Sequence, residues 1–191
     1  MVFDLLLQCL LMRFLAVILV QLLVLSGLAS AATLEKLSLE EMIQKSTEIV
    51  SGTVTGSSTL QRGPVIYTRY RIRVSDQWKG APAKELEVHV PGGKLGSLSQ
   101  TFSGAPRLQE GTEYVFFLWS SRSGLTQVIG LSQGLFGLKR ESSGEITLIR
   151  QASGEMMLDS SGRLVEDTPV SMRLREMVDR IHRTLAGGTQ R

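Results

Sequence analysis

Three arginines stand at alternate positions between residues 65 and 78, and they are the residues of this chain best placed to bind a ligand. Arg69, Arg71 and Arg73 follow Tyr67 with a constant spacing of two. In a β-strand, alternate side chains project from one face and lie about 6.6–7 Å apart. A row of basic groups beside an aromatic ring is typical of strand faces that bind anionic polymers. We therefore take these four residues as a candidate ligand-binding face, with an anionic polysaccharide as the ligand.

The same arginines also suit a structural role. Glu85, Glu87 and His89 alternate in the next predicted strand, and the parity of the turn between the strands lets them share the face of the arginines. Opposite charges on neighbouring strands attract each other, although exposed pairs contribute only about 0–1 kcal/mol each. We favour these cross-strand contacts over ligand binding.

Catalytic chemistry has few residues to use. A serine hydrolase needs a nucleophile, a base and an orienting acid, and His89 and His182 are the two histidines of the chain. We expect His89 to face outward from its strand and His182 to lie on the closing helix beside its apolar stripe. Residues 130–134 fit the pattern Gly-x-Ser-x-Gly, but they join two predicted short strands, whereas the nucleophile turn of a hydrolase leads from a strand into a helix. No cluster has the spacing of a zinc site. Residues 91–97 lack the Gly-Lys-Ser/Thr order of a phosphate-binding loop. The sequence therefore predicts no catalytic residue, no metal ligand and no cofactor.

Residues 1–31 have the pattern of a secretory signal peptide. Arg13 precedes an almost uninterrupted apolar run from Phe14 to Leu28, and three small residues end it. Cleavage before Ala32 is expected. The apolar run of about 15 residues is shorter than the ~20 that a membrane-spanning helix needs, so an uncleaved anchor is the weaker alternative.

The first eleven residues fit a signal less well, because Asp4 is acidic where positive charge is typical. A start at Met12 would remove them, and with them Cys9, the one cysteine of the chain. The rest of the chain therefore has no disulfide scaffold. The chain also lacks asparagine, which excludes N-glycosylation and suggests a GC-rich bacterial gene. We expect export to the periplasm or the extracellular space, with membrane contact only during export.

The composition is that of an ordinary globular domain, with 42% hydrophobic and 20% charged residues. A net charge of +3 is too small to indicate a nucleic-acid partner. About 160 residues follow the signal, enough for one domain with a hydrophobic core. We divide the chain into the signal at 1–31, a β-domain at 32–165, and a C-terminal helix with a short tail at 166–191.

Local patterns predict strands between two helices. Ser38 and Glu41 form a capping-box pattern at the start of a short helix. The stretch 65–78 is long for a strand, so a bend or bulge is expected in it. The run 114–119 is apolar throughout, as expected for a strand buried on both faces. Further strands are predicted at 49–55, 86–90, 127–130, 135–139 and 145–149, with a polar loop at 56–64.

The closing helix is expected to begin at Thr168 and Pro169, a capping residue followed by a proline suited to the first turn. Its polar face mixes both signs of charge, so we expect it to pack on the strands rather than bind a membrane. We interpret Glu166 and Asp167 as loop charges. Short strands separated by Gly-rich turns favour a small antiparallel barrel or sandwich. The apolar stripe of the helix comprises Val170, Leu174, Met177, Val178, Ile181 and Leu185.

The run from Leu37 to Gly80 resembles a netrin-like module, the OB-type barrel of the tissue inhibitors of metalloproteinases. The similarity lies in residues 47–54, in Trp78-Lys79-Gly80 at the end of the second strand, and in the spacing of Gly111 and Tyr114. It implies an OB-like antiparallel barrel. In those inhibitors an N-terminal cysteine meets the catalytic zinc of the protease. This chain has no cysteine beyond residue 9, so that mechanism does not carry over.

The chain also resembles a group of uncharacterised bacterial secreted proteins, in Tyr67-Thr68, Pro91-Gly92-Gly93 and Gln133-Gly134-Leu135-Phe136. That group has no known activity to transfer. We predict a non-enzymatic binding or accessory module with a protein partner. An anionic-polysaccharide binder is the alternative, a hydrolase of unrecognised type is the third hypothesis, and no nucleic-acid partner is expected.

Overall fold

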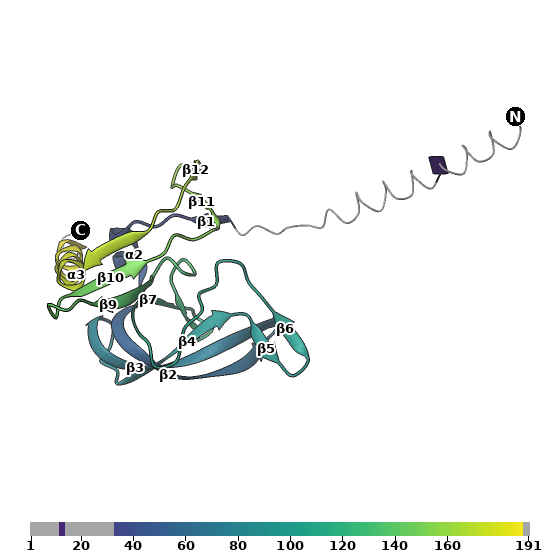
Figure 1. Cartoon of the computed structure of the whole chain (residues 1–191), viewed down its shortest axis with the longest axis horizontal. Coiled ribbons are helices and arrows are strands. Elements are labelled where there is room, and N and C mark those ends of the chain that lie inside the picture. The colour runs from purple at the N-terminus through teal and green to yellow at the C-terminus, as the bar shows by residue number, and fades with distance from the viewer. Residues whose placement is uncertain (1–11, 14–32, 189–191) are drawn as a thin grey trace, which may run out of the picture. The chain divides into compact units, whose positions relative to one another are not determined.

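Strands dominate the computed structural model, which describes residues 12–13 and 33–188 (Figure 1). The chain divides into two compact units, residues 1–31 and 32–191. The predicted signal peptide lies outside the described residues apart from Met12 and Arg13. Within the described residues, no helix is long and apolar enough to cross a membrane. The predicted fold class, mainly β with a short helix near the start and a longer helix near the end, is confirmed.

One long hairpin forms the middle of the main sheet. β2 (Glu48–Arg62) and β3 (Val65–Lys79) pair antiparallel, and Gly63, with a φ of 57°, turns the chain between them. The predicted polar loop at 56–64 is therefore wrong over most of its length. Its small polar residues continue β2 because β3 supplies a partner for their backbone groups. The pairing skips Ser75 and Trp78, which confirms the bulging expected in β3.

The hairpin belongs to an eight-stranded sheet in which paired strands run antiparallel. The order is β13-β10-β9-β7-β2-β3-β4, and β8 also pairs with β7. One edge of β7 serves two partners, since residues 114–116 pair with β9 and residues 118–120 with β8. The strands are β4 (Glu85–Pro91), β7 (Glu113–Ser120), β8 (Thr126–Val128), β9 (Leu135–Arg140), β10 (Ile146–Arg150) and β13 (Val170–Arg173).

The sheet curls toward a barrel without closing into one. β4 lies against β8, but in the described part of the chain the two strands share no backbone ladder. The OB-like barrel predicted above is therefore open between them. Two small sheets complete the fold, and in one of them β1 pairs with β11 in parallel, against the antiparallel expectation. Their strands are β5 (Gly93–Leu95), β6 (Leu98–Gln100), β1 (Thr33–Glu35), β11 (Met156–Leu158) and β12 (Leu164–Val165).

β7 separates two hydrophobic cores. Phe116 and Phe117 are both 0% exposed, yet they project from opposite faces of the strand. Phe116 lies inside the curled sheet, in a core with Val50, Val54, Ile72, Val88, Leu108, Leu118 and Val128. Phe117 lies between the sheet and the helices, in a core with Met42, Ile43, Ile49, Val115, Phe136, Leu148, Met177 and Ile181. Burial on both faces is thus confirmed, except at Trp119, which is half-exposed.

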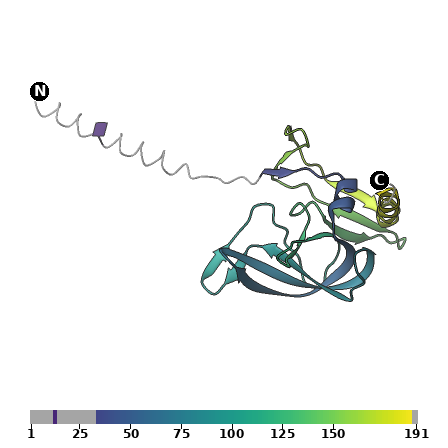
Figure 2. The same cartoon turned by 180° about the vertical axis from the view of Figure 1, so that it is seen from behind.

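The two helices pack together on one side of the sheet, as Figure 2 shows from behind. α2 (Leu39–Lys45) begins with the predicted capping box, in which Ser38 Oγ accepts from the Glu41 backbone and the Glu41 carboxylate accepts from the Ser38 backbone. Glu40 pairs with Arg180 of α3. Both acidic residues at the start of α2 therefore stabilise it, one by capping and one by a contact between helices.

α3 (Leu174–Gly188) begins six residues later than its sequence pattern suggested. Thr168 and Pro169 precede a strand, β13, whose residues Val170–Arg173 pair with β10. The expected stripe therefore comes from two elements: Val170 lies on β13, whereas Met177 and Ile181 of α3 are fully buried. Pairing with β10 satisfies the backbone of 170–173 as well as a first helical turn would.

Candidate functional site

The arginine face of β3 is built as a cross-strand ladder. In the pairing with β4, Arg69 lies opposite His89, Arg71 opposite Glu87 and Arg73 opposite Glu85. This confirms that the acidic residues share the face of the arginines. Arg69 makes an ion pair of 3.4 Å with Glu87, and its Nε donates to the Ser58 hydroxyl at 3.2 Å.

The other two arginines remain exposed on this face. The Arg71 guanidinium lies over Gly56 of β2, where an added Cβ would come within 2.8 Å of it. Tyr67 is half-buried at the end of the row. The structure therefore brings the four predicted residues onto one strand face, but none of them lines any of the three pockets described next.

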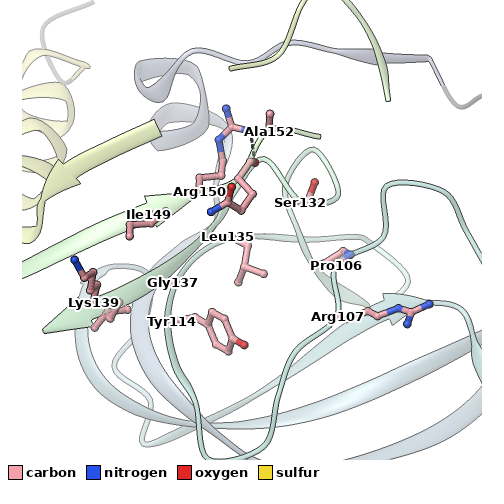
Figure 3. A pocket seen from close by; sticks show the side chains of 12 residues that line it. Pro106, Arg107, Tyr114, Ser132, Leu135, Gly137, Lys139, Ile149, Arg150 and Ala152 are labelled. Carbon is pink, nitrogen blue, oxygen red and sulfur yellow. Dashed lines mark hydrogen bonds between the residues drawn. The ribbon is translucent and has the colours of Figure 1, made fainter. Parts of the chain in front are cut away.

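Three pockets of similar volume open on the described surface. The first, which we call the β9 pocket, has a volume of about 450 Å³ and lies on the face of the sheet that points away from α3 (Figure 3). Tyr114, Leu135, Gly137 and Ile149 line it from three neighbouring strands, and Pro106 and Arg107 line it from the loop before β7.

Gly137 makes the β9 pocket possible. It pairs with Tyr114 on one side and with Ile149 on the other, so a side chain here would occupy the space between those two. A Cβ added at Gly137 would meet only the Ile149 carbonyl oxygen, at 3.7 Å, an ordinary contact. Fold geometry therefore does not require glycine at this position, and its absent side chain leaves an apolar hollow in the sheet.

The cations that line the β9 pocket are mostly neutralised. Lys139 pairs with Glu141 at 3.0 Å, and Arg150 pairs with the buried Asp167. Arg107 forms no ion pair with any described residue, but its guanidinium points away from Tyr114 in Figure 3. The floor of this pocket therefore suits an apolar group.

Arg150 and Asp167 form a buried ion pair behind this pocket. The guanidinium donates to both carboxylate oxygens, at 2.7 and 2.8 Å. Backbone N–H groups of Ser153 and Thr168 donate to the same carboxylate at 2.7 and 3.0 Å. Burial alone would raise the pKa of Asp167, but the hydrogen bonds and the charge of Arg150 outweigh it, so that pKa lies below its ordinary value.

Asp167 lies in the loop before β13, as its sequence suggested, but its charge is buried and paired. Asp167 and Arg150 are 8% and 7% exposed, and together they hold the segment after β10 against the segment before β13. No local sequence pattern predicts this pair, because Arg150 and Asp167 lie 17 residues apart and the chain between them has no regular repeat.

The second pocket, of about 440 Å³, lies between β3 and the hairpin of β5 and β6, and we call it the hairpin pocket. Tyr70 and Phe102 give it aromatic surface, and Lys94 and Arg107 give it positive charge. None of its lining residues is acidic. Burial raises the pKa of Tyr70, against a hydrogen bond from the backbone of Leu108, so the phenol stays neutral and adds no negative charge.

Hydrogen bonds hold the frame of the hairpin pocket in place. Gly92 and Gly93 have φ angles of 103° and 143°, which favour glycine. The Gly92 N–H donates to the Ile66 carbonyl and the Thr68 hydroxyl donates to the Gly92 carbonyl, both at 2.8 Å. Gln100 of β6 accepts from the Ile66 N–H at 2.7 Å. Segment 91–97 is therefore a structural connection, as its sequence suggested, and also one wall of a pocket.

The third pocket, of about 410 Å³, lies beside α3, and its lining includes acidic and basic residues, namely Asp76, Glu145, Arg173 and Arg175.

Neither histidine lines any of the three pockets. His182 is exposed on α3.

His89 was expected to face outward, and this prediction is wrong. It is only 8% exposed, because β8 covers the end of β4. Burial lowers the pKa of His89 and outweighs the backbone hydrogen bond at Thr126 and the charge of Glu87, which both raise it, so the neutral imidazole is favoured at pH 7. Its Nδ1 has no hydrogen-bond partner among the described residues.

Within the described residues, no three side chains of His, Cys, Asp or Glu gather closely enough to hold a metal ion. Comparisons with protein families, with curated proteins and with solved structures gave no match to this chain. Sequence reasoning missed Lys94, Arg107 and Gly137, and of these only Gly137 had a signal, a single glycine inside a predicted strand.

Proposed function

We propose that this protein is an exported, non-enzymatic binding module and that the β9 pocket receives an apolar side chain of a protein partner. The open floor at Gly137 carries the proposal, because it leaves apolar surface of Tyr114, Leu135 and Ile149 half-exposed inside a formed hollow. Concave, mainly apolar pockets of several hundred Å³ are the usual form of binding sites. A rigid sheet floor keeps the ordering cost of binding low.

Export is part of the proposal and rests on Arg13, the apolar run after it and the small residues before Ala32. N-terminal sequencing of the protein purified from a Gram-negative host should begin at Ala32 or within a residue or two. A product that keeps the apolar run would contradict it.

Filling the pocket is expected to abolish partner binding without harming the fold. In a Gly137→Leu variant the new side chain occupies the space between Tyr114 and Ile149, so a partner side chain loses its place. Burying one such side chain stabilises by about 1.5–3 kcal/mol, so affinity should fall about tenfold or more. The measurement is a pull-down from the culture that produces the protein, followed by mass spectrometry and titration of the identified partner.

Gly187→Leu is the matched control. Gly187 is exposed, an added Cβ there would meet no atom within 4 Å, and it lies on α3 away from the pocket residues. Proteins retained by the parent and by Gly187→Leu, but lost from Gly137→Leu, support the proposal. Retention of the same proteins by all three forms would remove the β9 pocket from consideration.

Binding of an anionic polysaccharide to the arginine face is a second candidate function. Arg71 and Arg73 favour it, since both are exposed and neither forms an ion pair with a described residue. Replacing Arg69, Arg71 and Arg73 together with glutamine should barely change stability, because exposed pairs contribute about 0–1 kcal/mol each. If the face binds glycan, the triple variant should leave a heparin column at markedly lower salt. Equal elution of parent and variant would eliminate this candidate.

A further inference from the structure

The hairpin pocket is lined by two cations, Lys94 and Arg107, and by no acidic residue. Three basic residues elsewhere on the sheet have carboxylate partners, Arg69 with Glu87, Arg140 with Glu113, and Arg173 with Glu145, whereas Arg71 and Arg73 line no pocket described here. Lys94 and Arg107 are both exposed, and neither forms an ion pair or a side-chain hydrogen bond within the described part of the chain. They line one pocket from two separate segments, β5 and the loop before β7.

The hairpin pocket and the β9 pocket are adjacent. Pro106 and Arg107 line both of them, so this loop is a ridge with the apolar β9 pocket on one side and the cationic hairpin pocket on the other. The Arg107 guanidinium points away from the β9 pocket floor (Figure 3). A partner segment that places an apolar residue beside Gly137 and continues across this loop therefore lies next to the positive charges of Lys94 and Arg107.

We propose that the partner contributes an acidic peptide segment, whose apolar side chain enters the β9 pocket and whose carboxylate binds between Lys94 and Arg107 in the hairpin pocket. This rests on the proposed function and adds the chemistry of the partner to it. The positive charges of Lys94 and Arg107 repel each other across this pocket. A carboxylate bound between them would offset this repulsion and accept charge-assisted hydrogen bonds from both side chains. The hydrogen-bonded frame at Gly92, Gly93 and Gln100 holds the pocket ready. Tyr70 and Phe102 supply apolar contact for the aliphatic part of the acidic side chain.

The test uses an array of synthetic decapeptides as the probe. Each peptide carries one central leucine and two glutamates at every relative spacing, and matched peptides carry glutamine or lysine in place of glutamate. The purified protein should bind a subset of the glutamate peptides, with binding that weakens as salt rises, and should not bind the lysine peptides. In a Lys94→Gln and Arg107→Gln double variant, binding should fall about tenfold or more, as expected for the loss of hydrogen bonds to a charged group.

A second double variant, Lys84→Gln and Arg183→Gln, is the control. It removes the same charge from exposed positions outside both pockets, so it should bind as the parent does. Circular dichroism of both variants checks the fold. Equal binding of glutamate and lysine peptides, no binding of any peptide, or unchanged binding by the Lys94 and Arg107 variant would each overturn the inference.

Two outcomes separate this inference from the proposed function. In the first, the Gly137→Leu variant loses a partner from the culture that the Lys94 and Arg107 variant still binds at full affinity. That result supports the proposed binding module and contradicts the inference that its partner is acidic. If the parent binds polygalacturonate through Lys94 and Arg107 but binds no peptide, the ligand is an anionic glycan and the peptide inference is wrong.

Discussion

Replacing Phe117 with alanine is expected to lower the free energy of unfolding by about 3–5 kcal/mol, and replacing Phe116 should cost a similar amount. Both rings are 0% exposed, and each has an aromatic neighbour in its own core. The Phe117 and Phe136 ring centroids lie 5.7 Å apart, and those of Phe116 and Tyr114 lie 5.8 Å apart. Either truncation leaves a cavity that the rigid pairing of β7 with its neighbours cannot collapse.

Thermal denaturation followed by circular dichroism measures this effect. For a domain of this size, a loss of 3–5 kcal/mol lowers Tm by about 6–20 °C. Trp119→Ala is the control on the same strand, because that ring is 45% exposed and its loss should cost about 1 kcal/mol or less. Phe116→Ala and Phe117→Ala variants that both melt within a degree or two of the parent would show that β7 does not divide two cores.

The second large effect concerns the buried ion pair. Asp167→Asn keeps the shape of the side chain but leaves the Arg150 guanidinium buried, 7% exposed, with no opposite charge. Removing one member of a buried pair costs about 3–5 kcal/mol, because the remaining charge has lost its compensation. Urea denaturation at pH 7 should show this as a lower midpoint with an unchanged m-value.

The pH dependence of this difference follows from the lowered pKa of Asp167. A carboxyl group whose pKa is lower in the folded state stabilises the fold above its unfolded pKa of about 3.9, and this contribution is lost as the pH falls through the folded pKa. The parent should therefore exceed Asp167→Asn in stability at pH 5–7, and the gap should narrow below about pH 4.

A double variant completes the test of the pair. Arg150→Met with Asp167→Leu removes both charges at once, and replacing a buried pair with apolar groups is often neutral or stabilising. It should recover most of the stability that Asp167→Asn loses. If Asp167→Asn unfolds at the same urea concentration as the parent across this pH range, the pair does not hold the segments around β10 and β13 together.

The features predicted correctly from the sequence depend on residues close together in the chain. The capping box of Ser38 and Glu41 needs only one turn of helix, and the two buried faces of β7 follow from an unbroken apolar run at 114–119. The face shared by the arginines of β3 and the acidic residues of β4 follows from period-two alternation across one short connection. In each case the local pattern and the final environment agree, so the pattern was sufficient.

The features that only the tertiary structure decided depend on segments far apart in the chain. Residues 56–62 are a strand because β3 lies beside them, and 170–173 are a strand because β10 does. β8 buries His89, and Arg150 finds Asp167 across an irregular segment. The pockets arise in the same way, since Arg107 lines one pocket together with Tyr114 and Gly137 and the other together with Lys94 and Phe102. The physical reason is that backbone pairing, burial and charge compensation are set by whichever element lies alongside, and spacing within one segment does not specify that neighbour.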